Sequence, residues 1–179
     1  MNPIEIIEKY YDAGSDAYKI LVNHSRSVAN KAMAIARSHP EMALDLQFIE
    51  QAAMLHDIGM IHCDAPEIGC HGYHAYIRHG YLGADMLRAE GLEPHALVCE
   101  RHTGTGISAA MIEEQGLPLP QRNFMPVTLE EQLICFADKF FSKTKLDKEK
   151  SVEKTLASLS KYGEETVERF RYWCKYFSQ

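Results

Sequence analysis

The chain has 179 residues, of which 46% are hydrophobic and 25% charged, and its formal net charge is −6. This length and apolar content predict a single domain over residues 1–179 with a sizeable core. The acidic balance argues against binding a nucleic-acid polymer through bulk positive charge, and no block of lysine and arginine indicates a membrane surface as a partner.

The start of the chain and its cysteines indicate the cytoplasm. The first residues lack a basic region followed by an apolar one, and no apolar run approaches the length that crosses a membrane. The five cysteines are scattered and form no C-x-x-C pair, so neither a disulfide framework nor a cysteine zinc site is expected: Cys63, Cys70, Cys99, Cys135 and Cys174. We therefore expect a soluble cytoplasmic protein with reduced thiols.

Apolar residues recur at helical spacing along nearly the whole chain, and no sustained strand-like alternation is present. The predicted fold class is all-α. In chain order, the expected helices cover residues 3–12, 16–39, 43–57, 75–89, 94–102 and 108–115, with a loop over 61–77 and a Pro-rich connector over 116–126. A capping box at Thr128-Leu129-Glu130-Glu131 begins the next helix. An antiparallel pair over 148–162 and 164–177, joined at Gly163, closes the chain.

Polar side chains interrupt the apolar faces of five of these helices. They are His24, His56 with Asp57, His79, His102 and Asp138. A single inward histidine is more often a hydrogen-bonded core residue than a ligand, but a buried carboxylate without a cation is costly or becomes neutral. Four imidazoles with two carboxylates form a ligand set suited to iron, manganese, zinc or cobalt. A transition-metal centre therefore explains all six positions at once.

The order His24, then His56-Asp57, then Asp138 resembles the pattern of the HD-domain superfamily of metal-dependent phosphohydrolases. The stretch Leu55-His56-Asp57-Ile58-Gly59 matches the HDIG-type signature of that family. The resemblance covers roughly residues 15–145 and leaves out the last helical pair, over about 148–177. It implies an all-α bundle that holds the metal between its central helices.

His79 and His102 fall at the positions used by the two-metal branch of the family. This resemblance implies one ion bound by His24, His56, Asp57 and Asp138, and a second bound by Asp57, His79 and His102. Two cations about 3.5 to 4 Å apart can share a hydroxide, lower its pKa toward neutrality and stabilise charge on a phosphoryl oxygen. Asp57 would be the catalytic bridge. The implied cofactors are two divalent transition-metal ions, iron first, with manganese, zinc, cobalt or nickel as alternatives.

The implied activity is hydrolysis of a small phosphate ester or nucleotide, and four basic residues are candidates for binding its phosphate. Arg78 and Arg101 directly precede ligand histidines, and Lys139 and Lys143 follow Asp138. The alternative for each is a solvated side chain or a structural ion pair.

The loop over 61–77 contributes three further histidines, His62, His71 and His74, which we expect to face solvent. Many two-metal relatives carry a lysine shortly after the His-Asp pair, whereas this chain has Met60 there. This difference argues against carrying over their cyclic-dinucleotide specificity.

Two other functions fit the same residues. The six-ligand pattern also resembles the HD-fold mixed-valent di-iron oxygenases, which activate O₂ and cleave C–C or C–P bonds. A metal-binding regulator without turnover is the third hypothesis. The ligands alone do not separate these functions, and a homo-oligomer is compatible with all of them.

Overall fold

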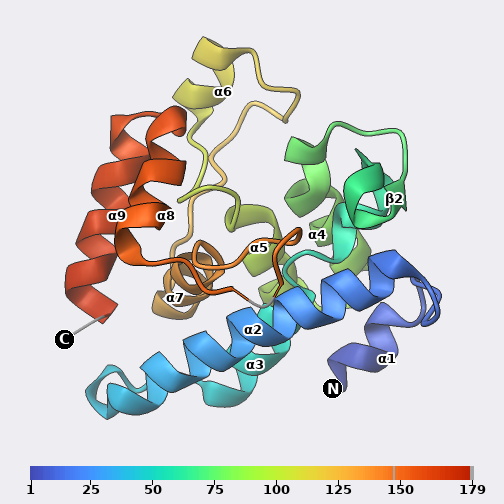
Figure 1. Ribbon diagram of the computed structural model, residues 1–179, viewed down its shortest axis with the longest axis horizontal. Helices are drawn as coiled ribbons and strands as arrows, with labels where there is room; N and C mark the ends of the chain where they lie inside the picture. Colours follow the sequence, from blue (N-terminus) through green and yellow to red (C-terminus); the bar gives the residue numbers. More distant parts are fainter. Residues whose placement is uncertain (147, 178–179) are drawn as a thin grey trace.

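The structure, a computed structural model, describes residues 1–146 and 148–177, so Asp147, Ser178 and Gln179 of the predicted 1–179 domain lie outside the described residues. Its regular structure is almost entirely helical, which confirms the all-α class (Figure 1). The α-helices are α1 (Pro3–Ile7), α2 (Asp16–Ser38), α3 (Leu46–Leu55), α4 (His79–Ala89), α5 (Glu93–Arg101), α6 (Ala109–Gln115), α7 (Leu129–Asp138), α8 (Val152–Leu159) and α9 (Glu164–Phe177).

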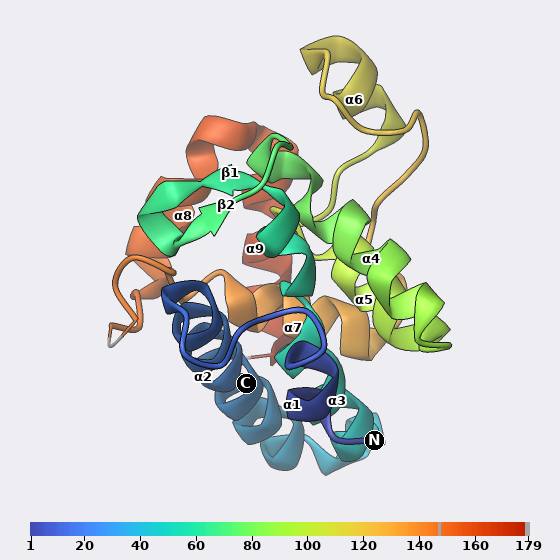
Figure 2. The same cartoon turned by 90° about the vertical axis from the view of Figure 1, so that its right-hand side faces the viewer.

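Helix α7 lies at the centre of the fold. Helices α2 and α3 form one pair and α4 and α5 a second, and α7 packs against members of both pairs and against α9 (Figures 1 and 2). The main hydrophobic core runs through these helices, from Leu21 and Val28 on α2 to Phe170 and Trp173 on α9. The last residue of α7, Asp138, is therefore buried inside the fold.

Side-chain caps determine where several helices begin. Ser15 accepts a hydrogen bond from the backbone of Tyr18 at the start of α2, and Thr128 accepts one from the backbone of Glu131 at the start of α7. The second half of the predicted capping box does not form, because the Glu131 carboxylate accepts instead from the backbone N–H of Val127 at 2.7 Å.

Four of the predicted helices are too long, among them the one predicted over 75–89, which begins at His79. The helix predicted over 3–12 ends at Ile7, and the helix predicted over 43–57 begins only at Leu46, after the N-cap Asp45, and ends at Leu55. The helix predicted over 148–162 begins at Val152 and continues as a 3-10 turn, η5 (Ser160–Tyr162). Its true start follows the N-cap Ser151, whose hydroxyl accepts from the backbone of Lys154.

The segment predicted as a loop over 61–77 has regular structure of its own. It contains η2 (Ile58–His62), β1 (Asp64–Ala65), η3 (Pro66–Ile68), β2 (Cys70–His71) and η4 (Tyr76–Arg78). The two short strands pair antiparallel, with Asp64 opposite His71 and Ala65 opposite Cys70. These strands are too short to produce a detectable alternation, and the 3-10 turn η4 explains why α4 begins at His79 rather than at residue 75.

Gly59 has a different role from the one its position suggests. A glycine two residues after Asp57, just beyond the end of α3, suggests a sharp turn that ends a helix, but Gly59 lies inside η2 and is buried. A Cβ atom there would lie 2.1 Å from the backbone oxygen of His79 and 2.3 Å from the backbone nitrogen of Gly83. Glycine at this position therefore allows η2 to pack directly against α4.

Helix α6 projects from the rest of the molecule (Figure 2). The segment around it packs on a second, smaller cluster of buried residues, Ile107, Ile112 and Phe124, with Tyr81 among the partly buried neighbours. The segment around α6 is thus stabilised by its own small cluster, separate from the main core.

All five cysteines are free thiols, as expected from their spacing, and four of them are buried. Within the described part of the chain, no helix combines the length and apolar character needed to cross a membrane.

Candidate metal centre

The six predicted ligands come from five helices, and five of them lie at a helix end. His24 is within α2, His56 is the C-cap of α3 and Asp57 follows it, His79 begins α4, His102 is the C-cap of α5 and Asp138 ends α7. All six are buried, with at most 8% of the residue surface exposed. The helix ends thus bring polar side chains from distant parts of the sequence to one interior point.

Three imidazoles are oriented by the backbone carbonyl three residues earlier. The Nδ1 atoms of His56, His79 and His102 each lie 2.6 Å from such an oxygen, on Ala53, Tyr76 and Cys99 respectively. Because a carbonyl oxygen only accepts, each Nδ1 donates its proton and each neutral ring keeps a lone pair on Nε2. The same arrangement fixes the tautomer of metal-bound histidines.

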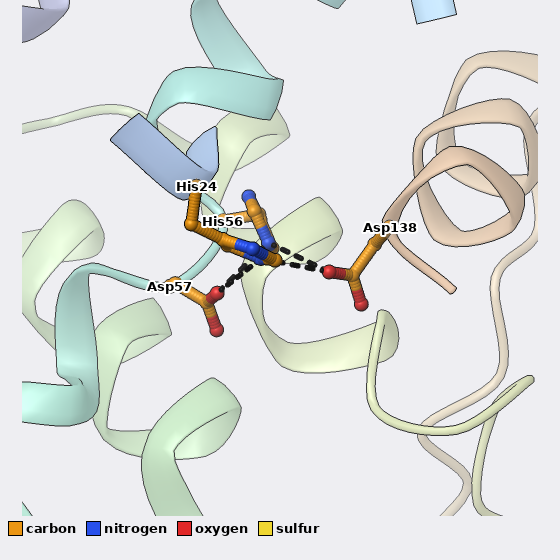
Figure 3. Close-up of side chains that lie close together, drawn as sticks. All are labelled: His24, His56, Asp57 and Asp138. Carbon is orange, nitrogen blue, oxygen red and sulfur yellow. Dashed lines mark hydrogen bonds and ion pairs between the residues drawn. The ribbon is translucent and has the colours of Figure 1, made fainter. Parts of the chain in front are cut away.

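The two carboxylate oxygens of Asp57 face different pairs of imidazoles. Its Oδ2 lies 3.2 Å from Nε2 of His24 and 3.0 Å from Nε2 of His56 (Figure 3). Its Oδ1 lies 3.2 Å from Nε2 of His79 and 3.3 Å from Nε2 of His102. One carboxylate can therefore contribute to two metal groups at once.

Asp138 completes the first of these groups. Its Oδ1 lies 2.9 Å from Nε2 of His24 and 3.4 Å from Nε2 of His56 (Figure 3). Within each group one donor atom per residue lies within 4.8 Å of all the others; the groups are His24, His56, Asp57 and Asp138, and Asp57, His79 and His102. The structure thus brings together all six residues that the sequence singles out.

Several donor atoms of the cluster face one another without a proton to share, an arrangement that metal ions would stabilise. Nε2 of His79 and Nε2 of His102 lie 3.0 Å apart, although both carry lone pairs when the rings are neutral. Oδ1 of Asp57 is buried with no hydrogen-bond partner among the described residues, whereas Oδ2 has the ammonium group of Lys143 beside it. A cation in each group would convert these unfavourable contacts into coordination, and imidazole nitrogen with carboxylate oxygen suits divalent transition metals. The buried clusters can therefore hold metal ions.

The electrostatics of the cluster favour positive charge. Burial alone would raise the pKa of Asp57, but His56 and Lys143 hold it well below its usual range. Burial would lower the pKa of His56, but the carboxylates of Asp57 and Asp138 raise it to about 9. Burial lowers the pKa of His102 to about 3, so that ring is neutral at pH 7 and keeps its lone pair.

Both predicted lysines lie at the centre. Nζ of Lys143 is 2.7 Å from Oδ2 of Asp57, and Nζ of Lys139 is 2.6 Å from Oδ2 of Asp138. Lys139 also donates to the backbone oxygen of His102 at 3.0 Å, so it contacts two of the ligand residues.

The two predicted arginines are placed differently. Arg101 donates to both carboxylate oxygens of Glu131 at 3.1 and 3.0 Å, so it forms a structural ion pair. Arg78 contacts Nδ1 of His74 at 3.1 Å. Neither arginine lines the cleft at the centre. Of the loop histidines, His62 and His71 are exposed and His74 is half-buried, and none belongs to either metal group.

A cleft of about 650 Å³ opens onto the centre. It reaches His79 and Asp138, one ligand from each group, and both Lys139 and Lys143 line it. Another part of its wall is apolar and includes Ile77, Ile107, Met111 and Leu117. A molecule in this cleft can therefore place a phosphate at the centre and an organic portion against apolar side chains.

Sequence reasoning missed Tyr76, which also lines the cleft. Its ring stacks on that of His79, with centroids 4.5 Å apart and planes 20° apart, and Nζ of Lys143 lies 5.7 Å from its centroid. Its hydroxyl is buried and has no hydrogen-bond partner among the described residues. The signal available was its position three residues before a candidate ligand, within a segment predicted as a loop.

Comparison with known proteins agrees with this geometry. Residues 21–142 match the family model described as HD domain, which is more than half of the chain. The chain belongs to the HD-domain family. The matched range contains all six candidate ligands of this HD-domain protein and ends just before Lys143.

Several relatives of this HD-domain protein are longer proteins. It is 31% identical over 174 residues to a tRNA (cytidine(56)-2'-O)-methyltransferase of Thermoplasma volcanium, covering 96% of this chain and 45% of that protein. A protein of the same name from Picrophilus torridus is 30% identical over 71% of this chain and 33% of its own length. An uncharacterized protein of Methanocaldococcus jannaschii is 34% identical over 70% of this chain and 68% of its own length. No solved structure matches the chain.

Proposed function

We propose that this HD-domain protein is a metal-dependent phosphohydrolase that uses two divalent transition-metal ions to cleave a phosphate ester or anhydride bond. The observation that carries the proposal is Asp57, whose two oxygens face two different imidazole pairs in a buried cluster open to a cleft. One ion would be held by His24, His56, Asp57 and Asp138, and the other by Asp57, His79 and His102. We propose iron as the natural metal, with manganese, zinc, cobalt or nickel as alternatives.

The chain's own residues bind and orient the substrate in this proposal. When bound, two such ions would supply a nucleophile by lowering the pKa of water and would stabilise charge on the phosphoryl oxygens. Lys143 shares Oδ2 of Asp57 with the first imidazole pair, so its ammonium group is positioned to bind a phosphoryl oxygen beside that carboxylate. Lys139 fixes Asp138 and the backbone of His102 while its charge faces the cleft. Tyr76 covers one face of His79 and excludes water from it.

We propose a small substrate rather than an RNA polymer. The names of two relatives describe tRNA methylation, so RNA is the competing class of substrate. The net charge of −6 disfavours a polyanionic polymer, and the cleft volume of about 650 Å³ suits a molecule of nucleotide size. The segment shared with those relatives contains the HD match, so we infer that it contributes phosphoester chemistry and not methyl transfer. Five free thiols support the cytoplasm as its location.

The test measures phosphate release with and without O₂. Iron-loaded and manganese-loaded proteins are assayed anaerobically against phosphate monoesters, phosphodiesters and nucleotides, with Asp57→Asn as the matched variant. We expect turnover that persists without O₂ and that falls more than about a hundredfold in Asp57→Asn, as for removal of a ligand shared by both ions. A parallel binding assay uses unmodified tRNA.

Three outcomes would overturn the proposal. Strictly O₂-dependent turnover would establish the oxygenase alternative. Full metal content without turnover of any phosphate ester would favour a metal-binding regulator. Tight binding of tRNA together with methyl transfer to it would assign the activity named for the relatives to this chain.

A further inference from the structure

The far wall of the cleft is built by the last part of the chain. Residues from the segment before α8, from α8 and from η5 line it, among them Lys150, Ser158, Lys161 and Tyr162. All of them lie beyond residue 142, where the match to the HD family model ends. This wall therefore lies outside the range matched by the family model, and it lines the same cleft as His79 and Asp138.

The cleft carries more positive than negative charge. Four lysines line it, against the two carboxylates of Glu67 and Asp138. The lysines are Lys139, Lys143, Lys150 and Lys161. This local surplus occurs in a protein whose formal net charge is −6, so it is not a consequence of overall composition. Such a surplus in a concave site attracts anions.

The four lysines fall into two kinds. Lys139 and Lys143 contact the ligand carboxylates of Asp138 and Asp57. Lys150 and Lys161, in contrast, pair with no carboxylate within residues 1–146 and 148–177; Nζ of Lys161 lies 4.8 Å from the ring centroid of Tyr162. Two ammonium groups at the far wall are therefore available for an anion.

The backbone of Lys150 joins this wall to the segment that follows α7. Its backbone N–H donates to the backbone oxygen of Phe140 at 2.8 Å, two residues after Asp138. Its side chain is half-buried; burial lowers its pKa, Asp138 raises it, and the three other cleft lysines lower it further. Like charges are thus gathered around one space, and a multiply charged anion there would relieve their repulsion.

We propose that Lys150 and Lys161 form a second anion-binding subsite, so that the preferred substrate carries a chain of two or more phosphates. The terminal phosphate would lie at Lys143 and the metal centre, and the next would lie at the far wall. This inference rests on the proposed function for the reacting phosphate, but binding at the second subsite needs no turnover and is measured separately.

The test compares the binding of inorganic phosphate and inorganic triphosphate to the metal-loaded protein by titration calorimetry. The variant is the double substitution Lys150→Met and Lys161→Met. The control is Lys148→Met with Lys154→Met, which removes two exposed lysines of the same segment that do not line the cleft. Both double variants change the net charge equally, so their difference isolates the local effect. Metal content and thermal unfolding are measured for each protein, before and after titration.

We expect wild type to bind triphosphate at least about tenfold more tightly than phosphate, as for one added charge-assisted hydrogen bond. The cleft variant should lose most of this preference and bind phosphate within about twofold of wild type, and the control variant should keep the preference. Because Lys161 is exposed, Lys161→Met alone serves if the double variant unfolds, with a partial loss expected.

Three results would overturn the subsite. Wild type could show no preference for triphosphate over phosphate, or the control variant could lose that preference as much as the cleft variant does. The cleft variant could also lose affinity for phosphate as much as for triphosphate. Failure of the proposed function would look different. If no phosphate ester is hydrolysed, while the preference for triphosphate is present and depends on Lys150 and Lys161, the subsite stands and the hydrolase assignment fails.

Discussion

Asp57 joins the two candidate metal groups, because each of its oxygens faces one pair of imidazoles. Replacing His102 by Ala should therefore lower the bound metal from two ions to one per chain, and His24→Ala should remove the other ion. Asp57→Ala should reduce both. Elemental analysis of the purified variants measures this directly. Two full equivalents in His102→Ala would contradict the assignment of that ring to the second ion.

Tyr76 provides a test of how the second group is oriented, because its ring stacks on His79. Tyr76→Leu should lower the affinity for the ion held by His79 and His102 by about three- to tenfold, the equivalent of one aromatic pair. Tyr76→Phe preserves the stack and should retain the affinity. Metal titration of the two variants separates the outcomes, and Tyr73→Phe, at a residue that is 98% exposed, is the neutral control. Equal affinities in Tyr76→Leu and Tyr76→Phe would show that the stack does not orient the ligand.

Among the elements, η2 and α4 must approach closely because Asp57 immediately precedes η2 and His79 begins α4. Gly59→Ala would place a Cβ atom 2.1 Å from the backbone oxygen of His79, so we expect a loss of more than about 3 kcal/mol in the free energy of unfolding.

Gly14→Ala is the control for this loss, since its Cβ would meet only the two carboxylate oxygens of Asp12, at 3.5 and 4.0 Å. Urea unfolding of both variants gives the comparison. A loss below about 1 kcal/mol in Gly59→Ala would mean that the backbone contact relaxes readily.

The same elements show what the sequence could and could not predict. Helical periodicity placed His24, His56 and Asp138 on inward faces, and the structure has all three buried. The short strands and 3-10 turns between Ile58 and Arg78 were missed, because elements of two to five residues are determined by tertiary hydrogen bonds rather than by a repeating pattern. Stacking of Tyr76 on His79 depends on one of those turns, so no sequence pattern indicates it directly.

At the scale of the whole molecule, the sequence predicts that the six candidate ligands are buried, as the structure has them. It does not predict which residues line the cleft. A basic residue next to a ligand in the sequence can contact substrate or form a structural ion pair, and Arg101 forms an ion pair with Glu131. Lys150 and Lys161 reach the cleft only because the C-terminal helices fold back beside α7, a long-range arrangement without a local signal.

That arrangement predicts that the C-terminal helices unfold together with the HD core. Phe136 on α7 packs against Phe170 and Phe177 on α9, with ring centroids 5.2 and 5.4 Å apart, and Trp173 donates to the side chain of Gln132 at 3.1 Å. Trp173 is the only tryptophan of the chain, so its fluorescence reports on α9 specifically.

We expect fluorescence and far-ultraviolet circular dichroism to give coincident urea transitions, because α9 shares its core with the central helix. Phe170→Ala should shift both transitions equally to lower urea, with a loss of about 3 to 5 kcal/mol in the free energy of unfolding. A fluorescence transition at lower urea than the loss of helicity would show that the C-terminal pair is a separate unit, and the prediction of one domain would then be wrong.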